Sequence, residues 1–239
     1  MSSPCLQVTR LTKRFADVVA VKDVSFEIGE GETLGLFGPN GSGKTTIINL
    51  ISGVYRPDVG SIRLWGEEIA GLKPHQVAAR GVARTFQLAR PFLNMTVYEN
   101  VLVARLARGG SLPRPEARVN DLLGFTGLLK QKDWPASRLS SGCLRRLEVA
   151  RALATEPRLI LVDEPLGGLS LKEEGIIRSL LREVQAAGVT MLVVSHRPDL
   201  LAELAGKVLI LCRGQVVREG PPAEVLPRAV EEVMHGRSP

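Results

Sequence analysis

The chain has 239 residues, of which 44% are hydrophobic and 23% are charged, so we expect one globular domain, with or without an inserted lobe, and exclude a disordered chain. Only 4% of the residues are aromatic, which disfavours a surface that binds single-stranded RNA by base stacking. The net charge of +6 predicts an anionic partner, which is a nucleotide, a nucleic acid or a membrane surface.

The sequence does not fit the membrane-spanning and secreted classes. No apolar run approaches the roughly 20 residues that cross a bilayer, and the N-terminal segment contains no long apolar stretch. The three cysteines lie far apart and the three histidines are scattered. Neither a disulfide framework nor a structural zinc site is therefore expected.

The first part of the chain predicts strands that lead into a glycine-rich loop. The alternating residues Leu6–Thr9 and Val24–Ile28 predict half-buried antiparallel strands. Thr33–Phe37 predicts a short apolar strand before the loop, and a helix is expected after it over residues 44–52.

The middle of the chain predicts helices. Between residues 91 and 156 there is almost no strand-like run, and Thr96 and Glu99 fit a capping box at the start of a helix that continues through Leu106. Gly109–Pro115 is rich in helix breakers, and a further helix is expected over about residues 116–123. We interpret this segment as a helical insertion within a larger fold.

After Pro157 the pattern alternates between strands and helices. Leu159–Val162 and Thr190–Val194 are apolar runs typical of parallel strands that are buried on both faces. The other predicted elements of this part are helices over 172–187 and 198–205, and strands over Val208–Cys212 and Gln215–Glu219 that form a hairpin across Arg213 and Gly214.

A phosphate-binding loop is predicted between the apolar strand and the helix that begins at Lys44. It matches G-x-x-x-x-G-K-[ST], in which glycines let backbone N–H groups point at phosphate oxygens and the helix start adds partial positive charge. Lys44 is expected to reach the β- and γ-phosphates, and the Thr45 hydroxyl to ligate Mg²⁺. The candidate nucleotide-binding residues here are Gly38, Pro39, Asn40, Gly41, Ser42, Gly43, Lys44, Thr45 and Thr46.

Two carboxylates follow the buried strand Leu159–Val162. Asp163 is placed for the Mg²⁺ shell, because ligands bind at the carboxyl ends of strands in open α/β sheets. Glu164 can point to the γ-phosphate side and polarise the attacking water. An acidic turn is the alternative, but together with the loop upstream the pair indicates a P-loop ATPase or GTPase.

Further motifs narrow this class. Leu139–Arg146 occupies the place of the LSGGQ signature of ATP-binding-cassette (ABC) proteins, about 20 residues before Asp163. With the phosphate-binding loop, Gln87 and His196, the chain resembles an ABC ATPase over nearly its whole length. The resemblance implies an α/β fold with a P-loop NTPase (RecA-like) core, an antiparallel β-subdomain and an inserted α-helical subdomain. We expect the core and β-subdomain in residues 1–87 and 157–239, and the helical subdomain in residues 88–156.

The resemblance also implies a head-to-tail dimer, in which each ATP lies between one subunit's phosphate-binding loop and the other subunit's signature. Ser140 offers a hydroxyl there, and Ser141 and Gly142 offer backbone amides at the start of a helix predicted over Leu144–Ala154. A helix N-terminus attracts a γ-phosphate, although an ordinary helix cap is the alternative.

Three positions depart from the family pattern. Ser141 replaces a glycine and Cys143 a glutamine of the signature, and Ser170 stands where the family often has an aspartate. These changes bear on ATP sandwiching and on communication between the two sites. The phosphate-binding loop, Asp163 and Glu164 match the family, so hydrolysis is expected.

The resemblance implies roles for three more residues. Gln87 would touch Mg²⁺ or the lytic water at the junction into the helical insertion. His196 would bond the γ-phosphate and orient Glu164, and Phe15 would stack on adenine. The alternatives are a solvated loop glutamine, a structural histidine and an aromatic core residue.

The chain is also similar to the ATP-binding subunits of branched-chain amino-acid importers. Parts of this pattern are shared with urea and amide importers and with the lipopolysaccharide-export ATPase. The similarity implies a second ATP-binding subunit, identical or paralogous, integral membrane permeases that dock on residues 88–104, and indirectly an extracytoplasmic solute-binding protein. The chain is then expected at the cytoplasmic face of the inner membrane, without a nucleic-acid partner. The segments that carry the similarity are Gly81–Gln87, Phe92–Ala104, Arg145–Arg151 and Gly168–Glu173.

Two other functions stay open at this point. A non-transport ABC ATPase acting on nucleic acid or ribosomes fits the basic charge, but such proteins usually carry two cassettes or a long coiled-coil insertion. A regulatory or degenerate cassette fits the altered signature. Neighbouring permease genes would favour the importer, and hydrolysis by the assembled complex would exclude the degenerate cassette.

Overall fold

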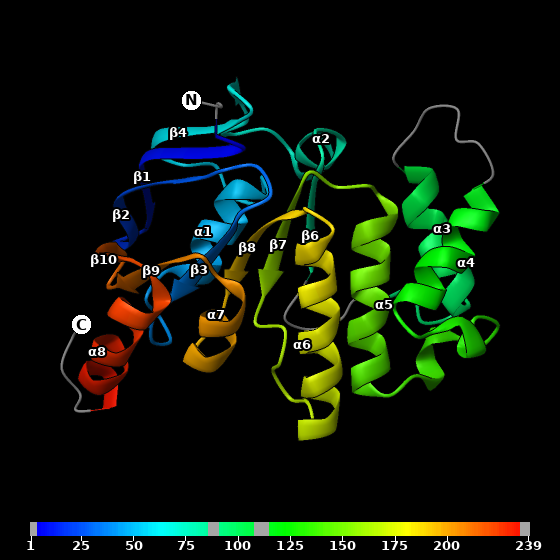
Figure 1. Cartoon of the computed structure of the whole chain (residues 1–239). Helices are drawn as coiled ribbons and strands as arrows, with labels where there is room; N and C mark the ends of the chain where they lie inside the picture. Colours follow the sequence, from blue (N-terminus) through cyan, green and yellow to red (C-terminus); the bar gives the residue numbers. More distant parts are fainter. Residues whose placement is uncertain (1–3, 86–90, 108–114, 235–239) are drawn as a thin grey trace.

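The computed structural model describes residues 4–85, 91–107 and 115–234, and these form two β-sheets and a helical lobe (Figure 1). The lobe extends from the β6–β7 side of the larger sheet. The strands are β1 (Leu6–Phe15), β2 (Val18–Ile28), β3 (Thr33–Phe37), β4 (Val59–Leu64), β5 (Glu67–Glu68), β6 (Val82–Thr85), β7 (Leu159–Asp163), β8 (Thr190–Val194), β9 (Lys207–Cys212) and β10 (Gln215–Gly220). The helices are α1 (Lys44–Ile51), α2 (Pro74–Ala79), α3 (Val97–Ala107), α4 (Pro115–Phe125), α5 (Ser141–Ala154), α6 (Leu171–Ala186), α7 (Pro198–Leu204) and α8 (Pro222–Met234), with short 3-10 turns at Leu129–Gln131 and Ala136–Arg138.

The larger sheet has the strand order β10-β9-β3-β8-β7-β6 and is parallel except for the β9–β10 hairpin. Every residue of β3, β7 and β8 is buried, because alternate side chains pack on opposite faces. Leu159 and Leu161 join a cluster with residues of α1 and the smaller sheet, whereas Ile160 and Val162 join a cluster with α6 and α7. This double burial explains the uninterrupted apolar runs.

The smaller sheet is antiparallel, with the order β2-β1-β4-β5. Leu6 pairs with Ile28, and Phe15 pairs with Val18 across the turn of the hairpin. Both strands are longer than the alternating patterns predict. The added segments carry charged residues such as Lys13 and Lys22, which mask the alternation although the backbone pairing continues.

The helical lobe has its own hydrophobic core, formed by residues of α3, α4 and α5. The predicted capping box begins α3, since the Glu99 N–H donates to Thr96 Oγ1 over 3.1 Å and the Thr96 N–H donates to Glu99 Oε2 over 2.7 Å. Helix α5 belongs to two cores: Leu147 and Ala150 pack in the lobe, and Val149 and Ala152 pack against the larger sheet. The lobe is therefore joined to the sheet through one shared helix.

Several elements differ from the sequence-based expectation. Helix α5 begins at Ser141 rather than at Leu144, because Ser140 caps it by accepting the Cys143 N–H over 3.3 Å. The sequence patterns did not indicate α2, β4, β5, β6 or α8. Most of the predicted breaker-rich loop Gly109–Pro115 lies outside the described residues. Within the part of the chain that is described, none of the helices has the length and apolar character to span a bilayer.

Candidate functional site

The carboxyl ends of three neighbouring parallel strands carry the predicted site. Leu36 of β3 pairs with Val194 of β8, and Val194 also pairs with Asp163 of β7. The phosphate-binding loop after β3, the carboxylates at the end of β7 and His196 after β8 therefore converge at one edge of the larger sheet.

The phosphate-binding loop needs its glycines at particular positions. Gly43 has φ 106°, and a Cβ there would lie 2.5 Å from the carbonyl oxygen of Ala20. A Cβ on Gly38 would lie 2.2 Å from the carbonyl oxygen of Leu211. The N-cap residue of α1 is Gly43, so no side chain of the N-cap bonds the first turn, and that turn carries no acidic residue. The first N–H groups of α1 are thus available to an anion.

Lys44 is buried and points back into the loop. Its Nζ donates to the carbonyl oxygens of Gly38 over 2.7 Å and of Pro39 over 2.9 Å. Burial lowers the pKa of the Lys44 ammonium, and the nearby carboxylates of Glu164 and Asp163 oppose part of that shift. A phosphate at this place would compensate a charge that the fold alone leaves poorly solvated.

A cavity of about 440 Å³ opens over the loop. The β9–β10 hairpin contributes to its wall, and the Gly214 N–H donates to the Ser42 carbonyl oxygen over 2.9 Å. Arg213 and Gly214 were not predicted as site residues, although the hairpin that carries them was predicted. The lining residues are Val18, Val19, Ala20, Asn40, Gly41, Gly43, Lys44, Thr45, Thr46, Glu164, Arg213 and Gly214.

Asp163 is 2% exposed and has two differently placed oxygens. Oδ2 accepts a hydrogen bond from Arg84 Nη2 over 3.1 Å. Oδ1 is buried and has no hydrogen bond with any residue that the structure describes. An unpaired buried carboxylate oxygen beside a phosphate-binding loop fits an Mg²⁺ shell, because Mg²⁺ prefers oxygen ligands and often reaches them through water.

Glu164 lines the cavity and is held by the segment after β8. The His196 N–H donates to Glu164 Oε1 over 3.1 Å, and His196 Nδ1 lies 2.8 Å from Oε2. Ser195 Oγ is 3.4 Å from the same Oε2. Glu164 has φ 45°, an uncommon value for a residue other than glycine. The side chain of His196 is 57% exposed, so one edge of the ring stays open to a ligand.

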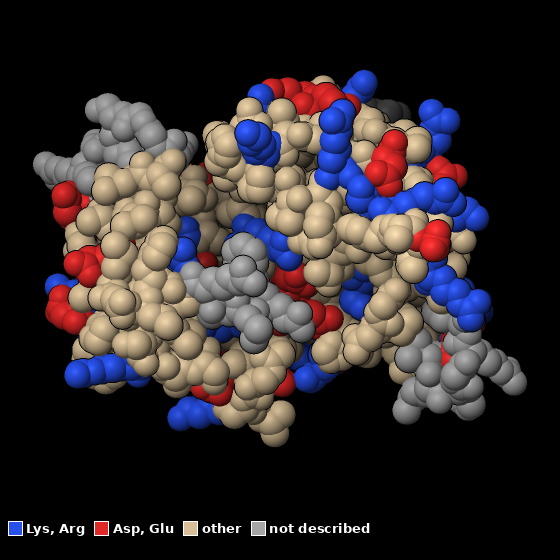
Figure 2. All heavy atoms as spheres, turned by 180° about the vertical axis from the view of Figure 1, so that it is seen from behind, with Lys and Arg blue, Asp and Glu red and all other residues tan. Residues whose placement is uncertain are grey.

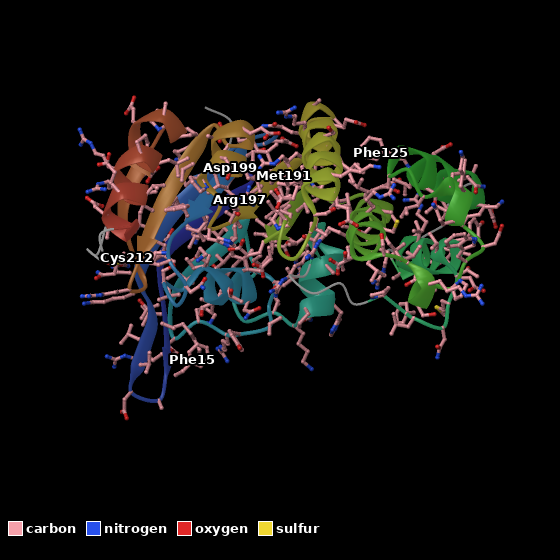
Figure 3. All side chains as sticks on the ribbon, turned by 90° about the horizontal axis from the view of Figure 1, so that it is seen from below. Phe15, Phe125, Met191, Arg197, Asp199 and Cys212 are labelled. Atoms are coloured by element: carbon pink, nitrogen blue, oxygen red, sulfur yellow. The ribbon has the colours of Figure 1, made fainter. Side chains whose placement is uncertain are left out.

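Of the two remaining predicted site residues, the structure describes Phe15 but not Gln87. Phe15 is 39% exposed and lies near the outer end of the β1–β2 hairpin, where its ring contacts Tyr55 edge-on at 5.0 Å (Figure 3). It is a surface aromatic rather than a core residue, but it does not line the cavity over the loop. Gln87 lies outside the described residues.

The signature residues lie apart from this cavity. Ser140 caps α5, and Ser141 and Gly142 form its first turn. Ser140 and Gly142 line a separate cavity of about 340 Å³ together with Arg146, Lys172 and Glu173. The Gly142 N–H donates to Glu173 Oε1 over 3.1 Å. One chain alone does not bring the signature to its own phosphate-binding loop.

Comparison with known proteins gives a consistent result. The sequence model of the ABC transporter family matches residues 21–167. The high-affinity branched-chain amino acid transport ATP-binding protein BraF of Pseudomonas aeruginosa is 35% identical over 94% of both chains. The corresponding protein LivG of Salmonella typhimurium is 36% identical, again over 94% of both chains.

Solved structures agree with this similarity. The ATP-binding cassette MJ1267 in its ADP conformation superposes with a TM-score of 0.88 at 29% identity, and covers 97% of this chain and 99% of its own. The ATP-binding cassette MJ0796, a dimer in a post-hydrolysis state bound to ADP and Pi, has a TM-score of 0.81 at 27% identity over 91% of this chain and 98% of its own.

Proposed function

The chain belongs to the ABC transporter family as a nucleotide-binding, ATP-hydrolysing subunit, and from that premise we propose that it drives an importer of branched-chain or related amino acids. The observation that carries this solute class is the similarity to BraF and LivG along almost the full length of all three chains. The family match over residues 21–167 includes the helical lobe as well as the phosphate-binding loop.

Hydrolysis is assigned to Glu164. Its carboxylate is fixed by the backbone N–H and the ring of His196, and it faces the cavity that would hold the phosphates. A carboxylate in this position accepts a hydrogen bond from the attacking water and orients it toward the γ-phosphorus. His196 holds Glu164, and its exposed ring edge is free to donate to a γ-phosphate oxygen.

The phosphates are assigned to the loop and the start of α1. Backbone N–H groups of Gly41–Thr46 and the Lys44 ammonium supply positive charge, and the buried Ser42 hydroxyl has no hydrogen bond within the described residues. Thr45 and Asp163 would hold Mg²⁺, and Gln87 would contribute from the lobe junction. When bound, Mg²⁺ neutralises phosphate charge in the transition state. Phe15 would stack on the adenine, and the cavity reaches its hairpin because Val18 and Val19 are among the lining residues.

The active unit is proposed to be a head-to-tail dimer with an identical or paralogous cassette. The signature at the start of α5 is separated from the chain's own phosphate-binding loop, so a second chain must supply it. The Gly142 N–H donates to Glu173 Oε1 in the single chain, so a γ-phosphate from across the interface would take the place of this carboxylate at the start of α5.

The membrane subunits are proposed to dock on the groove between the larger sheet and the lobe, at the cytoplasmic face of the inner membrane. This groove, of about 290 Å³, is lined mostly by apolar residues of α2, α3, α5 and β6. Val54 on its rim is half-exposed, and the half-exposed Phe92 lies beside the lining residue Arg151 at 5.2 Å. Figure 2 shows acidic and basic side chains interspersed over the face it presents, which gives no support to a nucleic-acid surface on that face.

Glu164→Gln tests the proposal in the transporter assembled in proteoliposomes with its permease subunits. We expect ATP hydrolysis to fall by about 10²–10⁴-fold, because the general base is lost while the shape of the side chain is kept. Glu219→Gln, at an exposed position on β10, is the matched control. Unchanged hydrolysis in E164Q would exclude Glu164 as the base. Wild-type hydrolysis that does not respond to the binding protein loaded with leucine, isoleucine, valine or any other amino acid would exclude the amino-acid importer.

A further inference from the structure

Arg84 links Asp163 to the helix that follows the phosphate-binding loop. It is the third residue of β6 and pairs in register with Leu161 of β7, two residues before Asp163. Arg84 Nη2 lies 3.1 Å from Asp163 Oδ2, and Nη1 lies 2.6 Å from Oδ1 of Asn49 on α1. A planar guanidinium with separate terminal nitrogens can hold two acceptors in a fixed geometry, which a lysine ammonium cannot do equally well.

The contact with Arg84 gives the two oxygens of the Asp163 carboxylate different surroundings. Oδ2 is held by Arg84, whereas Oδ1 is buried without a hydrogen bond to any described residue. A carboxylate that is 2% exposed needs compensating charge, and Arg84 provides it from the Oδ2 side. The contact also restricts rotation of the carboxylate, so Oδ1 keeps one position.

We propose that Arg84 is a positioning residue for the divalent cation. It fixes Oδ2 of Asp163, which leaves Oδ1 for the cation or its water, and it ties this carboxylate to α1, the helix at the phosphate-binding loop. The inference rests on the proposed function, because Asp163 serves as a metal ligand only if the chain binds a metal–nucleotide complex. Groups that orient a metal ligand change metal affinity by about 10–100-fold when they are removed.

The test uses the full chain saturated with ADP. Mn²⁺ is then added as the probe for the divalent-cation site. The electron paramagnetic resonance signal of free Mn²⁺ gives the Mn²⁺ affinity of the complex, and a separate titration in EDTA gives the ADP affinity without metal. We expect Arg84→Met to weaken Mn²⁺ binding by about tenfold or more, while the ADP affinity in EDTA stays that of the wild type.

Three further variants separate metal positioning from general damage. Arg84→Lys keeps the charge but cannot hold both acceptors, so an intermediate Mn²⁺ affinity is expected. Asn49→Ala removes only the far end of the bridge and should weaken Mn²⁺ binding less than R84M. Arg158→Met is the control, since Arg158 precedes β7 at the opposite end of the same strand pair and stacks over Trp65 at 3.5 Å.

Two results would contradict the role of Arg84 in metal binding. Equal Mn²⁺ affinity in R84M and the wild type would overturn the role of Arg84. An equal loss of ADP affinity in EDTA would also overturn it, because the damage would then not concern the metal. If R84M does not fold, R84K and N49A carry the same test. If wild-type chain with ADP binds Mn²⁺ no more tightly than free ADP does, the proposed metal site itself is wrong, whatever the variants show.

Discussion

Lys44 shows how a single residue serves function at the expense of stability. Its ammonium is buried, and burial lowers its pKa although Glu164 and Asp163 pull in the opposite direction. A lowered pKa means that the charged form is less stable in the folded chain than in the unfolded chain. Among the described residues, the hydrogen bonds of the Lys44 ammonium go to two backbone carbonyl oxygens of the loop.

Lys44→Met is therefore expected to stabilise the nucleotide-free chain while it abolishes nucleotide binding. Replacing the buried charge by an apolar side chain of similar length should raise the free energy of unfolding by roughly 1 kcal/mol. Urea unfolding without nucleotide measures this, and fluorescence titration with a labelled ATP measures binding. Lys207→Met, which removes an exposed pair with Glu219, should give no gain. A K44M chain less stable than the wild type would contradict the argument.

At the scale of elements, α6 and α7 are joined by an ionic network next to the site. Arg197, directly after His196, lies beside Asp199 of α7 (Figure 3) and pairs with it. Arg197 also pairs with Glu174 on α6. Arg178 on α6 pairs with Asp199 and Glu203. The hydrogen bond from Arg197, with further help from Arg178, holds the pKa of Asp199 below its ordinary value.

Asp199→Asn is expected to lower the free energy of unfolding at neutral pH by about 0.5–1 kcal/mol, as for other half-exposed ion pairs. Because the pKa of Asp199 is depressed in the folded chain, its contribution is present above about pH 4 and is lost as the pH falls through the folded-state pKa. Urea unfolding of D199N and the wild type at pH 7 and at a series of pH values that extends below the folded-state pKa of Asp199 checks this. Asp133→Asn is the exposed control, and a stability difference that persists unchanged at low pH would count against it.

Site residues could be predicted from the sequence where they lie close together along the chain. The phosphate-binding loop is contiguous, and Asp163 and Glu164 directly follow a buried strand, so their positions could be predicted without the fold. The first turn of α5 could not, because its residues Ser141–Cys143 are poor helix formers and only the Ser140 cap places them in the helix.

Residues whose role depends on strand order escaped prediction. Arg84 reaches Asp163 only because β6 lies next to β7, and β6 itself is a short strand in which two of the four residues, Arg84 and Thr85, are polar. Arg213 reaches the nucleotide cavity only because β9 lies next to β3. Both contacts join segments that are distant in sequence, so no local pattern reports them.

At the scale of the whole molecule, the surface around the predicted signature carries an exposed apolar side chain. Leu171, the first residue of α6, is 86% exposed, although it is a large apolar residue. It follows Ser170, which lines the same cavity as Ser140 and Gly142. An apolar side chain placed beside a candidate phosphate site is typical of the buried centre of an interface.

Leu171→Asp, combined with E164Q to prevent turnover, is expected to abolish ATP-induced dimerisation and leave ATP binding by the monomer unchanged. A buried unpaired charge at the interface would oppose closure. Size-exclusion chromatography with light scattering measures the dimer. Leu129→Asp, at an exposed position in the helical lobe, serves as the control. Normal dimerisation of the L171D chain would place the interface elsewhere.

Helix α5 has a mechanical consequence. Its first turn carries the signature, whereas Arg151 and the residue after its last turn, Thr155, line the groove proposed for the permeases. A helix of 14 residues is about 21 Å long and behaves as a stiff rod. Because this rod is packed on both sides, a push at its groove end must tilt its signature end as well. A displacement in the groove proposed for the permeases would therefore be transmitted along α5 to the predicted signature at its first turn.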